Sequence, residues 1–241
     1  LASISVALYN IGRLKDCISF ATQVLNYNSS LHSVNVALAS ALAMNGSLDD
    51  SLSLMNSLVK QLTNERQVIG ADVYERRAQV LLALGDTNSS IADLTLSLAI
   101  TPSINSYTSR ANAFIRNQNF YSAKLDIMNA IKLGANTAHL WNMLGRCERE
   151  FGEPEKAIQA QARALKFDNT NKEVLLELAV IYMSISDSKR ALEYIDKCLE
   201  YDPNFKNAHG YKGLLYQNMG KAKETIAAFR ESYRIDPKDT Q

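Results

Sequence analysis

Apolar residues recur along most of the chain at the i, i+3, i+4 and i+7 spacing that places them on one face of a helix. The stretches that follow this spacing are rich in Ala, Leu, Ser and Lys. Turn residues are sparse, with 4 Pro and 10 Gly in 241 residues, whereas an all-β chain needs turn residues much more often. The pattern therefore predicts an all-α protein.

Side-chain sizes repeat along the chain with a period close to 34 residues. A bulky residue is followed four places later by a small one, and both then lie on the same helix face. The small residue lets a second helix approach closely, and a later glycine suits the end of the first helix. The bulky positions are Tyr74, Tyr107, Trp141, Leu175 and His209, and the small positions are Ala78, Ala111, Gly145, Ala179 and Gly213. The sequence thus predicts a repeated helix–turn–helix unit.

This unit resembles the tetratricopeptide repeat (TPR), most clearly over residues 138–171, where Trp141, Gly145, Gly152 and Ala157 occupy the expected positions. The resemblance implies an all-α, right-handed α–α superhelix, a TPR solenoid. We expect a single superhelix over residues 1–241, cut from a longer protein. One step of the repeat is 39 residues long, which predicts a longer second helix or a longer loop around residues 60–70. The seven expected repeats span residues 1–31, 32–70, 71–103, 104–137, 138–171, 172–205 and 206–241.

Two repeats carry an additional pair of charged residues. Arg77 and Arg110 each follow a tyrosine by three places, and Asp93 and Asp126 each lie sixteen places further on. The later repeats lose both members together, which predicts an ion pair between the two helices of one repeat. We interpret these pairs as structural, with a role in ligand binding as the alternative.

The TPR resemblance also implies that the first helix of each repeat lines a concave groove. Asn side chains there could bond the backbone of an extended peptide, and Arg side chains could bind its carboxylates. We therefore expect a peptide-binding groove for a partner with acidic character. The alternative is an ordinary solvated helix face. The expected groove residues are Arg76, Gln79, Asn112, Arg116, Asn142, Arg146 and Arg149.

Charge and composition narrow the classes of partner. The net charge is +1, without the basic excess typical of nucleic-acid binding, and no apolar stretch is long enough to span a membrane. The three cysteines are far apart, as in a chain from a reducing compartment. No motif for a catalytic residue, a metal site or a cofactor is present. We therefore expect a non-enzymatic protein without cofactors in the cytoplasm, with the nucleus as the alternative location.

The leading hypothesis is a scaffold or adaptor that binds a peptide segment of another protein in the concave groove. One alternative is the non-catalytic TPR arm of a larger enzyme such as a glycosyltransferase. A second is homo-oligomerisation, because residues 1–70 carry only four basic and four acidic residues. The segment from Tyr74 to Leu94 is also similar in style to long TPR regulators such as the plant suppressor of immune-receptor signalling and its animal relative.

Overall fold

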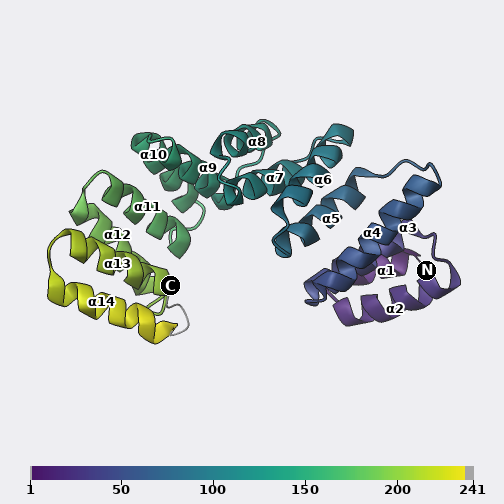
Figure 1. The fold of residues 1–241 in the computed structure, drawn as a ribbon, viewed down its shortest axis with the longest axis horizontal. Helices are drawn as coiled ribbons and strands as arrows, with labels where there is room; N and C mark the ends of the chain where they lie inside the picture. The colour runs from purple at the N-terminus through teal and green to yellow at the C-terminus, as the bar shows by residue number, and fades with distance from the viewer. Residues whose placement is uncertain (1, 237–241) are drawn as a thin grey trace. The chain divides into compact units, whose positions relative to one another are not determined.

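The computed structural model describes residues 2–236, and this part of the chain consists of helices joined by turns, without strands. The predicted all-α solenoid of about seven helix–turn–helix repeats is thereby confirmed (Figure 1). The helices are α1 (Ala2–Asn10), α2 (Leu14–Tyr27), α3 (His32–Met44), α4 (Leu48–Asn64), α5 (Ala71–Ala83), α6 (Thr87–Ile100), α7 (Ile104–Arg116), α8 (Phe120–Lys132), α9 (Ala138–Glu150), α10 (Pro154–Leu165), α11 (Lys172–Ser184), α12 (Ser188–Tyr201), α13 (Lys206–Asn218) and α14 (Ala222–Ile235).

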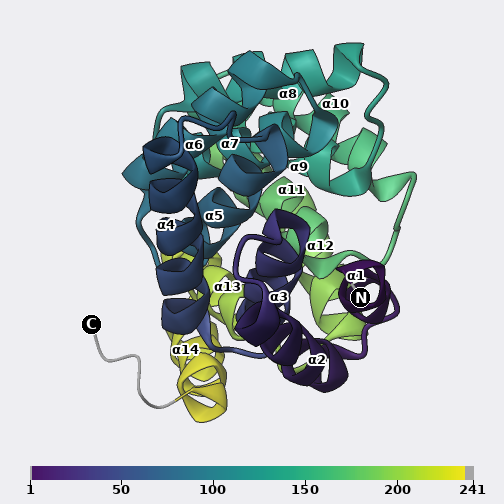
Figure 2. The same cartoon turned by 90° about the vertical axis from the view of Figure 1, so that its right-hand side faces the viewer.

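The chain divides into two compact units, and each is described by itself. Unit 1 comprises Leu1–Leu133 and contains α1 to α8, and unit 2 comprises Gly134–Gln241 and contains α9 to α14. That all seven repeats form one continuous superhelix stays a prediction. Within each unit, an odd-numbered helix packs on the even-numbered helix that follows it, and that helix packs on the next odd-numbered one. Figure 2 shows this stacking for α1, α2 and α3 of unit 1.

Helix starts and helix ends follow from local side-chain chemistry. Six helices begin after a residue whose side chain accepts a hydrogen bond from a backbone N–H of the first turn, namely Asp86, Ser103, Asn119, Thr137, Asn171 and Asp187. After the first helix of a repeat, the chain turns through a residue with positive φ, such as Gly85 at +87°. Gln118 and Ser186 occupy the matching positions at +57° and +61°. The turn therefore requires this conformation even where the sequence lacks the favoured glycine.

The two helices of each repeat meet at the small residue of the first helix. The residue that faces it lies sixteen places later on the second helix. Ala78, Ala111 and Ala179 are fully buried and match Leu94, Ile127 and Ile195 at that spacing. A Cβ atom added at Gly145 would lie 2.5 Å from Gln161 Nε2, and one at Gly213 would lie 2.7 Å from Phe229 Cε1. Glycine thus replaces alanine where the facing side chain occupies the space of a methyl group.

The long step between the second and third repeats comes mainly from a longer second helix. α4 has 17 residues, longer than any other helix in the described part of the chain. Its connection to α5, residues 65–70, is as long as residues 166–171 between α10 and α11. Of the two alternatives left open by the sequence, the longer helix is therefore the one that sets this repeat apart. This insertion lies directly before α5, which carries the first two expected groove residues.

Candidate peptide-binding groove

The expected groove residues lie on three first helices and are divided between the two units. Arg76 and Gln79 lie on α5, Asn112 and Arg116 lie on α7, and these four belong to unit 1. Asn142, Arg146 and Arg149 lie on α9, which belongs to unit 2. The expected residues of the fourth repeat thus belong to unit 1 and those of the fifth to unit 2. That they line one groove together stays a prediction.

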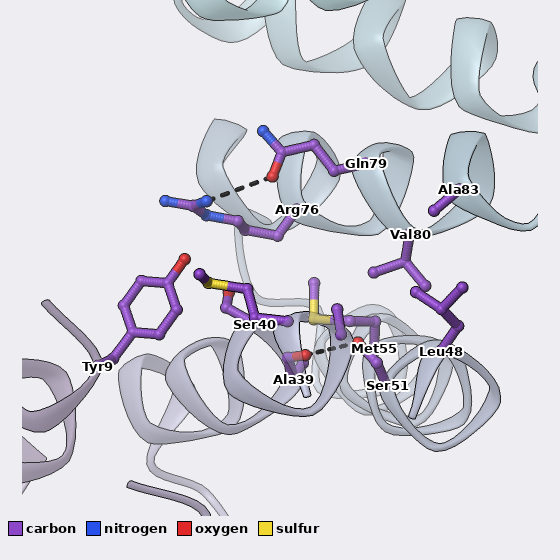
Figure 3. A pocket seen from close by; sticks show the side chains of 12 residues that line it. Tyr9, Ala39, Ser40, Leu48, Ser51, Met55, Arg76, Gln79, Val80 and Ala83 are labelled. Carbon is purple, nitrogen blue, oxygen red and sulfur yellow. Dashed lines mark hydrogen bonds between the residues drawn. The ribbon is translucent and has the colours of Figure 1, made fainter. Parts of the chain in front are cut away.

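Unit 1 contains a hollow of about 220 Å³ between α1, α3, α4 and α5 (Figure 3). We call it the α3–α5 hollow. Most of its wall is apolar, and Tyr9 and Arg76 lie toward one end, with Leu48 and Val80 toward the other. The lining residues are Tyr9, Ala39, Ser40, Ala43, Met44, Leu48, Ser51, Met55, Arg76, Gln79, Val80 and Ala83.

Two serines in the wall do not present free hydroxyl protons to the hollow. Ser51 Oγ donates a hydrogen bond to the carbonyl oxygen of Ala39 at 2.6 Å, and Ser40 Oγ donates one to the carbonyl oxygen of Val36 at 2.8 Å. Because a hydroxyl has a single proton to donate, both serines are occupied as donors. The interior of the hollow therefore behaves as an apolar surface.

The polar groups of the hollow gather at its rim. Arg76 Nη1 donates a hydrogen bond to Gln79 Oε1 at 3.3 Å, and Arg76 Cζ lies 5.9 Å from the centre of the Tyr9 ring. Both partners are neutral, so the guanidinium keeps its positive charge and several N–H donors available. The rim thus offers a cation beside an apolar cavity.

The expected groove residues on α7 have a different environment. Arg116 Nη1 donates a hydrogen bond to the carbonyl oxygen of Leu82 at 2.8 Å, near the end of α5 in the preceding repeat. The same carbonyl also accepts a bond from the backbone N–H of Gly85 at 3.3 Å, so Arg116 adds a second donor at the helix end. Asn112 is half-buried. Arg116 therefore helps to join two repeats, and its remaining donors are available to a ligand.

In unit 2, the expected groove arginines meet a carboxylate that sequence reasoning had not assigned to them. Arg146 Nε lies 3.5 Å from Glu177 Oε1, and Arg149 Nη1 lies 3.5 Å from Glu177 Oε2. Arg149 Nη2 also lies 2.8 Å from Glu150 Oε1. Two arginines and two glutamates leave this part of the face close to electrically neutral. Glu177 sits on α11 one repeat later, so only helix packing brings it to α9.

Asn142 is also engaged within unit 2. Gln161 Nε2 donates to the backbone oxygen of Asn142 at 3.2 Å and to its side-chain Oδ1 at 3.1 Å. The amide nitrogen of Asn142 stays available as a donor. The side-chain oxygen of Asn142 therefore takes part in the packing of its own repeat. Only its NH₂ group is left for the peptide-binding role that the sequence predicts.

The two predicted Arg–Asp pairs have bidentate geometry. Arg77 Nε and Nη2 each donate to a carboxylate oxygen of Asp93 at 2.7 Å. Arg110 Nε and Nη2 donate to Asp126 at 2.7 and 2.8 Å. The third nitrogen of Arg110 donates to Thr95 on the preceding second helix at 3.0 Å, so each such pair bridges repeats as well as helices. The hydrogen bond to Asp93 raises the pKa of Arg77, and the one to Asp126 raises that of Arg110.

The cysteines and acidic groups show no sign of a reactive centre. Cys17, Cys147 and Cys198 are buried free thiols, and burial raises the pKa of Cys198 to about 11. A thiol with such a pKa stays protonated at neutral pH and is a weak nucleophile. Within residues 2–236, no group of His, Cys, Asp and Glu could hold a metal ion, and no helix is long and apolar enough to cross a bilayer.

Comparison with known proteins agrees with the repeat pattern and the fold. Models described as tetratricopeptide repeat match residues 108–172, 173–205 and 208–239. A curated relative, "DnaJ homolog subfamily C member 3" from Gallus gallus, is 21% identical over 95% of this chain. The alignment covers 55% of that relative, so this chain spans about half of its length.

Two solved structures show the same fold at low sequence identity. A tetratricopeptide repeat protein from Parabacteroides merdae superposes with a TM-score of 0.76 at 15% identity, over 98% of this chain and 92% of that one. YrrB, described as a TPR protein with an unusual peptide-binding site, superposes with a TM-score of 0.55 at 18% identity, over 75% of this chain and 93% of that one.

Proposed function

The chain belongs to the tetratricopeptide repeat family, and from this premise we propose that it is a scaffold that binds a peptide segment of a partner on its first-helix faces. The TPR fold supports a role in protein interaction, and we place this chain among binding proteins rather than enzymes. The α3–α5 hollow carries the proposal, because it is an apolar cavity with a polar rim on first helices of unit 1. Such cavities are the usual form of a recognition site.

The partner that we propose is another protein, and its bound segment is extended and has acidic character. Arg76 faces neutral partners, and Arg116 keeps donors beyond its bond to Leu82. By contrast, Arg146 and Arg149 already face Glu177. Among the expected groove arginines, those without a carboxylate partner therefore lie in unit 1. The sequence alone predicts binding arginines in both units.

A peptide array followed by amide hydrogen exchange tests this proposal. We expect the chain to bind a subset of arrayed peptides, and the strongest of them to slow amide exchange on first helices such as α3 and α5. Second helices such as α6 and α8 should change less, because no residue of theirs lines the hollow. Protection restricted to second helices, or an array from which no peptide binds in solution, would rule the proposal out.

A second candidate function, association of two copies, is favoured by the surface of α14. Ile226, Phe229 and Tyr233 are 54%, 38% and 56% exposed. The matching residues of α12 are Leu192, Ile195 and Leu199, and they pack in one core cluster with residues of α13. α14 thus has an exposed apolar face of the kind that α12 buries beneath the next helix.

The occupant that we propose for this face is α1 of a second copy. Ile4 and Ile11 on and just after α1 are 49% and 67% exposed, so the first repeat also presents uncovered apolar residues. A contact between two different surfaces is heterologous and can continue from copy to copy. Such an assembly would extend the solenoid by repeating its own packing between molecules.

Light scattering over a range of concentrations tests this association. We expect the mass to rise above 26.8 kDa with concentration, and Ile226→Lys to hold the chain at the monomer mass. Leu96→Lys, which changes an exposed leucine on α6, serves as the control and should associate like the parent. A monomer mass at every concentration would contradict the proposed association. So would equal association of the Ile226→Lys and Leu96→Lys variants.

A further inference from the structure

The α3–α5 hollow arises from a local departure from the repeat pattern. In the second repeat, the groove side of α3 carries Ser40 and Ala43. At the positions that match Ser40, the following repeats carry the longer side chains Gln79, Asn112 and Arg146. Small side chains at one repeat and long ones at the next leave space between them. The hollow thus depends on residue size at groove positions, while packing residues such as Met55 form part of its wall.

The size of the hollow suits one bulky apolar side chain. Its volume is about 220 Å³, and an engineered apolar protein cavity of about 150 Å³ is large enough to bind benzene. Met55 and Val80 in its wall are 0% and 4% exposed, so they form a fixed surface that belongs to the core of unit 1. A leucine, methionine or phenylalanine side chain that entered the hollow would bury apolar surface against these residues.

The positive charge of Arg76 at the rim determines which ligand residue is favoured beside the buried apolar side chain. Arg76 is the single charged residue among the twelve that line the hollow, and no lining residue is acidic. Within residues 2–236, Arg76 forms no ion pair, and its hydrogen bond goes to the neutral amide of Gln79. An unpaired guanidinium beside an apolar cavity favours a carboxylate on the ligand, since Arg binds carboxylates through two parallel hydrogen bonds.

We propose that the α3–α5 hollow is the anchor site for a peptide in which a bulky apolar residue lies next to an acidic one. The apolar side chain enters the space beside Ala43, and the carboxylate contacts Arg76 at the rim. This inference rests on the proposed function, because it names the class of peptide that the groove takes. It joins two expected groove residues of the third repeat, Arg76 and Gln79, to a wall in the second repeat where no groove residue was expected.

A positional peptide library tests the inference directly. The probe is a set of short peptides of equal length in which two adjacent positions are fixed in turn and the others are randomised. Binding to the full chain is measured by fluorescence polarisation. We expect the strongest binding for Leu, Met or Phe beside Asp or Glu, and at least about tenfold weaker binding when the apolar residue is Ala. A tenfold change corresponds to about 1.4 kcal/mol, just below the roughly 1.5–3 kcal/mol gained by fully burying one such side chain.

Two substitutions separate the two halves of the proposed site. Ala43→Leu places a side chain in the hollow and keeps a strong helix former in α3. It should abolish the preference for a bulky apolar residue, whereas Ala162→Leu, at an exposed position of α10, should leave that preference intact. Arg76→Glu should reverse the preference from Asp or Glu to Lys or Arg and keep the apolar preference. Lys60→Glu makes the same charge change at an exposed position of α4 and should reverse nothing.

The outcomes distinguish this inference from the broader proposal. If peptides bind but Ala43→Leu leaves the residue preferences unchanged, the anchor site is wrong and the scaffold function stands. If Arg76→Glu leaves the acidic preference unchanged, the role of the rim is wrong. If no peptide of the library binds the parent chain, both the anchor site and the peptide-binding function fail. Circular dichroism on each variant confirms that the helices are retained.

Discussion

Replacing Ile195 by alanine lowers the free energy of unfolding by about 2–5 kcal/mol, the range observed when a large core residue is truncated. Ile195 lies on α12, is 0% exposed and belongs to a core cluster that includes residues of α11 and α13. Its side chain therefore lies in a core that α12 shares with α11 and α13, and truncation leaves a cavity in that core. We expect urea denaturation, followed by circular dichroism, to show a midpoint shifted to lower urea.

The control for this substitution is Ile185→Ala in the same unit. Ile185 lies just after α11 and is 43% exposed, so we expect a change within about 0.5 kcal/mol. Because solenoids are stabilised mainly by contacts between neighbouring repeats, the loss at Ile195 should also speed amide exchange in α11 to α13 more than in α3 to α5. Equal effects of the two substitutions would show that the α12 core does not hold unit 2 together.

Removing the carboxylate of Asp126 should be similarly destabilising. Asp126→Ala leaves the guanidinium of Arg110 without its bidentate partner. The side chain of Arg110 is 18% exposed and that of Asp126 is 4% exposed. Breaking a buried ion pair by removing one partner costs about 3–5 kcal/mol. Because water still reaches part of Arg110, we expect a loss near the lower end of that range. Urea denaturation of Asp126→Ala against the parent chain measures it.

The chain itself supplies the matched double variant for this test. At the positions that match Arg110 and Asp126, the fifth repeat carries Leu144 and Ala160, which are 8% and 4% exposed. We therefore expect Arg110→Leu combined with Asp126→Ala to recover most of the stability lost in the single variant, because no charge is left buried. Asp16→Ala breaks an exposed ion pair with Arg13 and should cost less than about 1 kcal/mol. A double variant as unstable as Asp126→Ala would contradict the interpretation.

The fold could be predicted from the sequence because the repeat depends on contacts close together along the chain. A small residue and its facing residue lie sixteen places apart, so their recurrence is visible as a pattern of sizes. The Arg–Asp pairs share this spacing, and their joint presence and joint absence are visible for the same reason. The turns inside a repeat are harder to recognise in the sequence, because Gln118 and Ser186 adopt positive φ where other repeats have a glycine.

The candidate site depends on contacts of another kind. Glu177 on α11 pairs with Arg146 and Arg149 on α9, the first helix of the preceding repeat. The hollow combines residues from α1, α3, α4 and α5. Such groupings depend on how successive repeats stack. One visible signal was the small size of Ser40 and Ala43 at groove positions, which could have pointed to the second repeat. The polar residues of the third to fifth repeats are the more visible signal, and of these Arg76 and Gln79 lie at the hollow.

By itself, the sequence determined the helical repeat, its period and the ion pairs within a repeat. These features follow from residue size and charge at fixed spacings, because the spacing of residues along a helix decides which of its faces each side chain occupies. Tertiary structure alone decided which groove arginines face a carboxylate, where the wall opens into a hollow, and that Arg76 stands at its rim. These properties arise between repeats, where the stacking of one helix pair on the next sets the partners of each side chain.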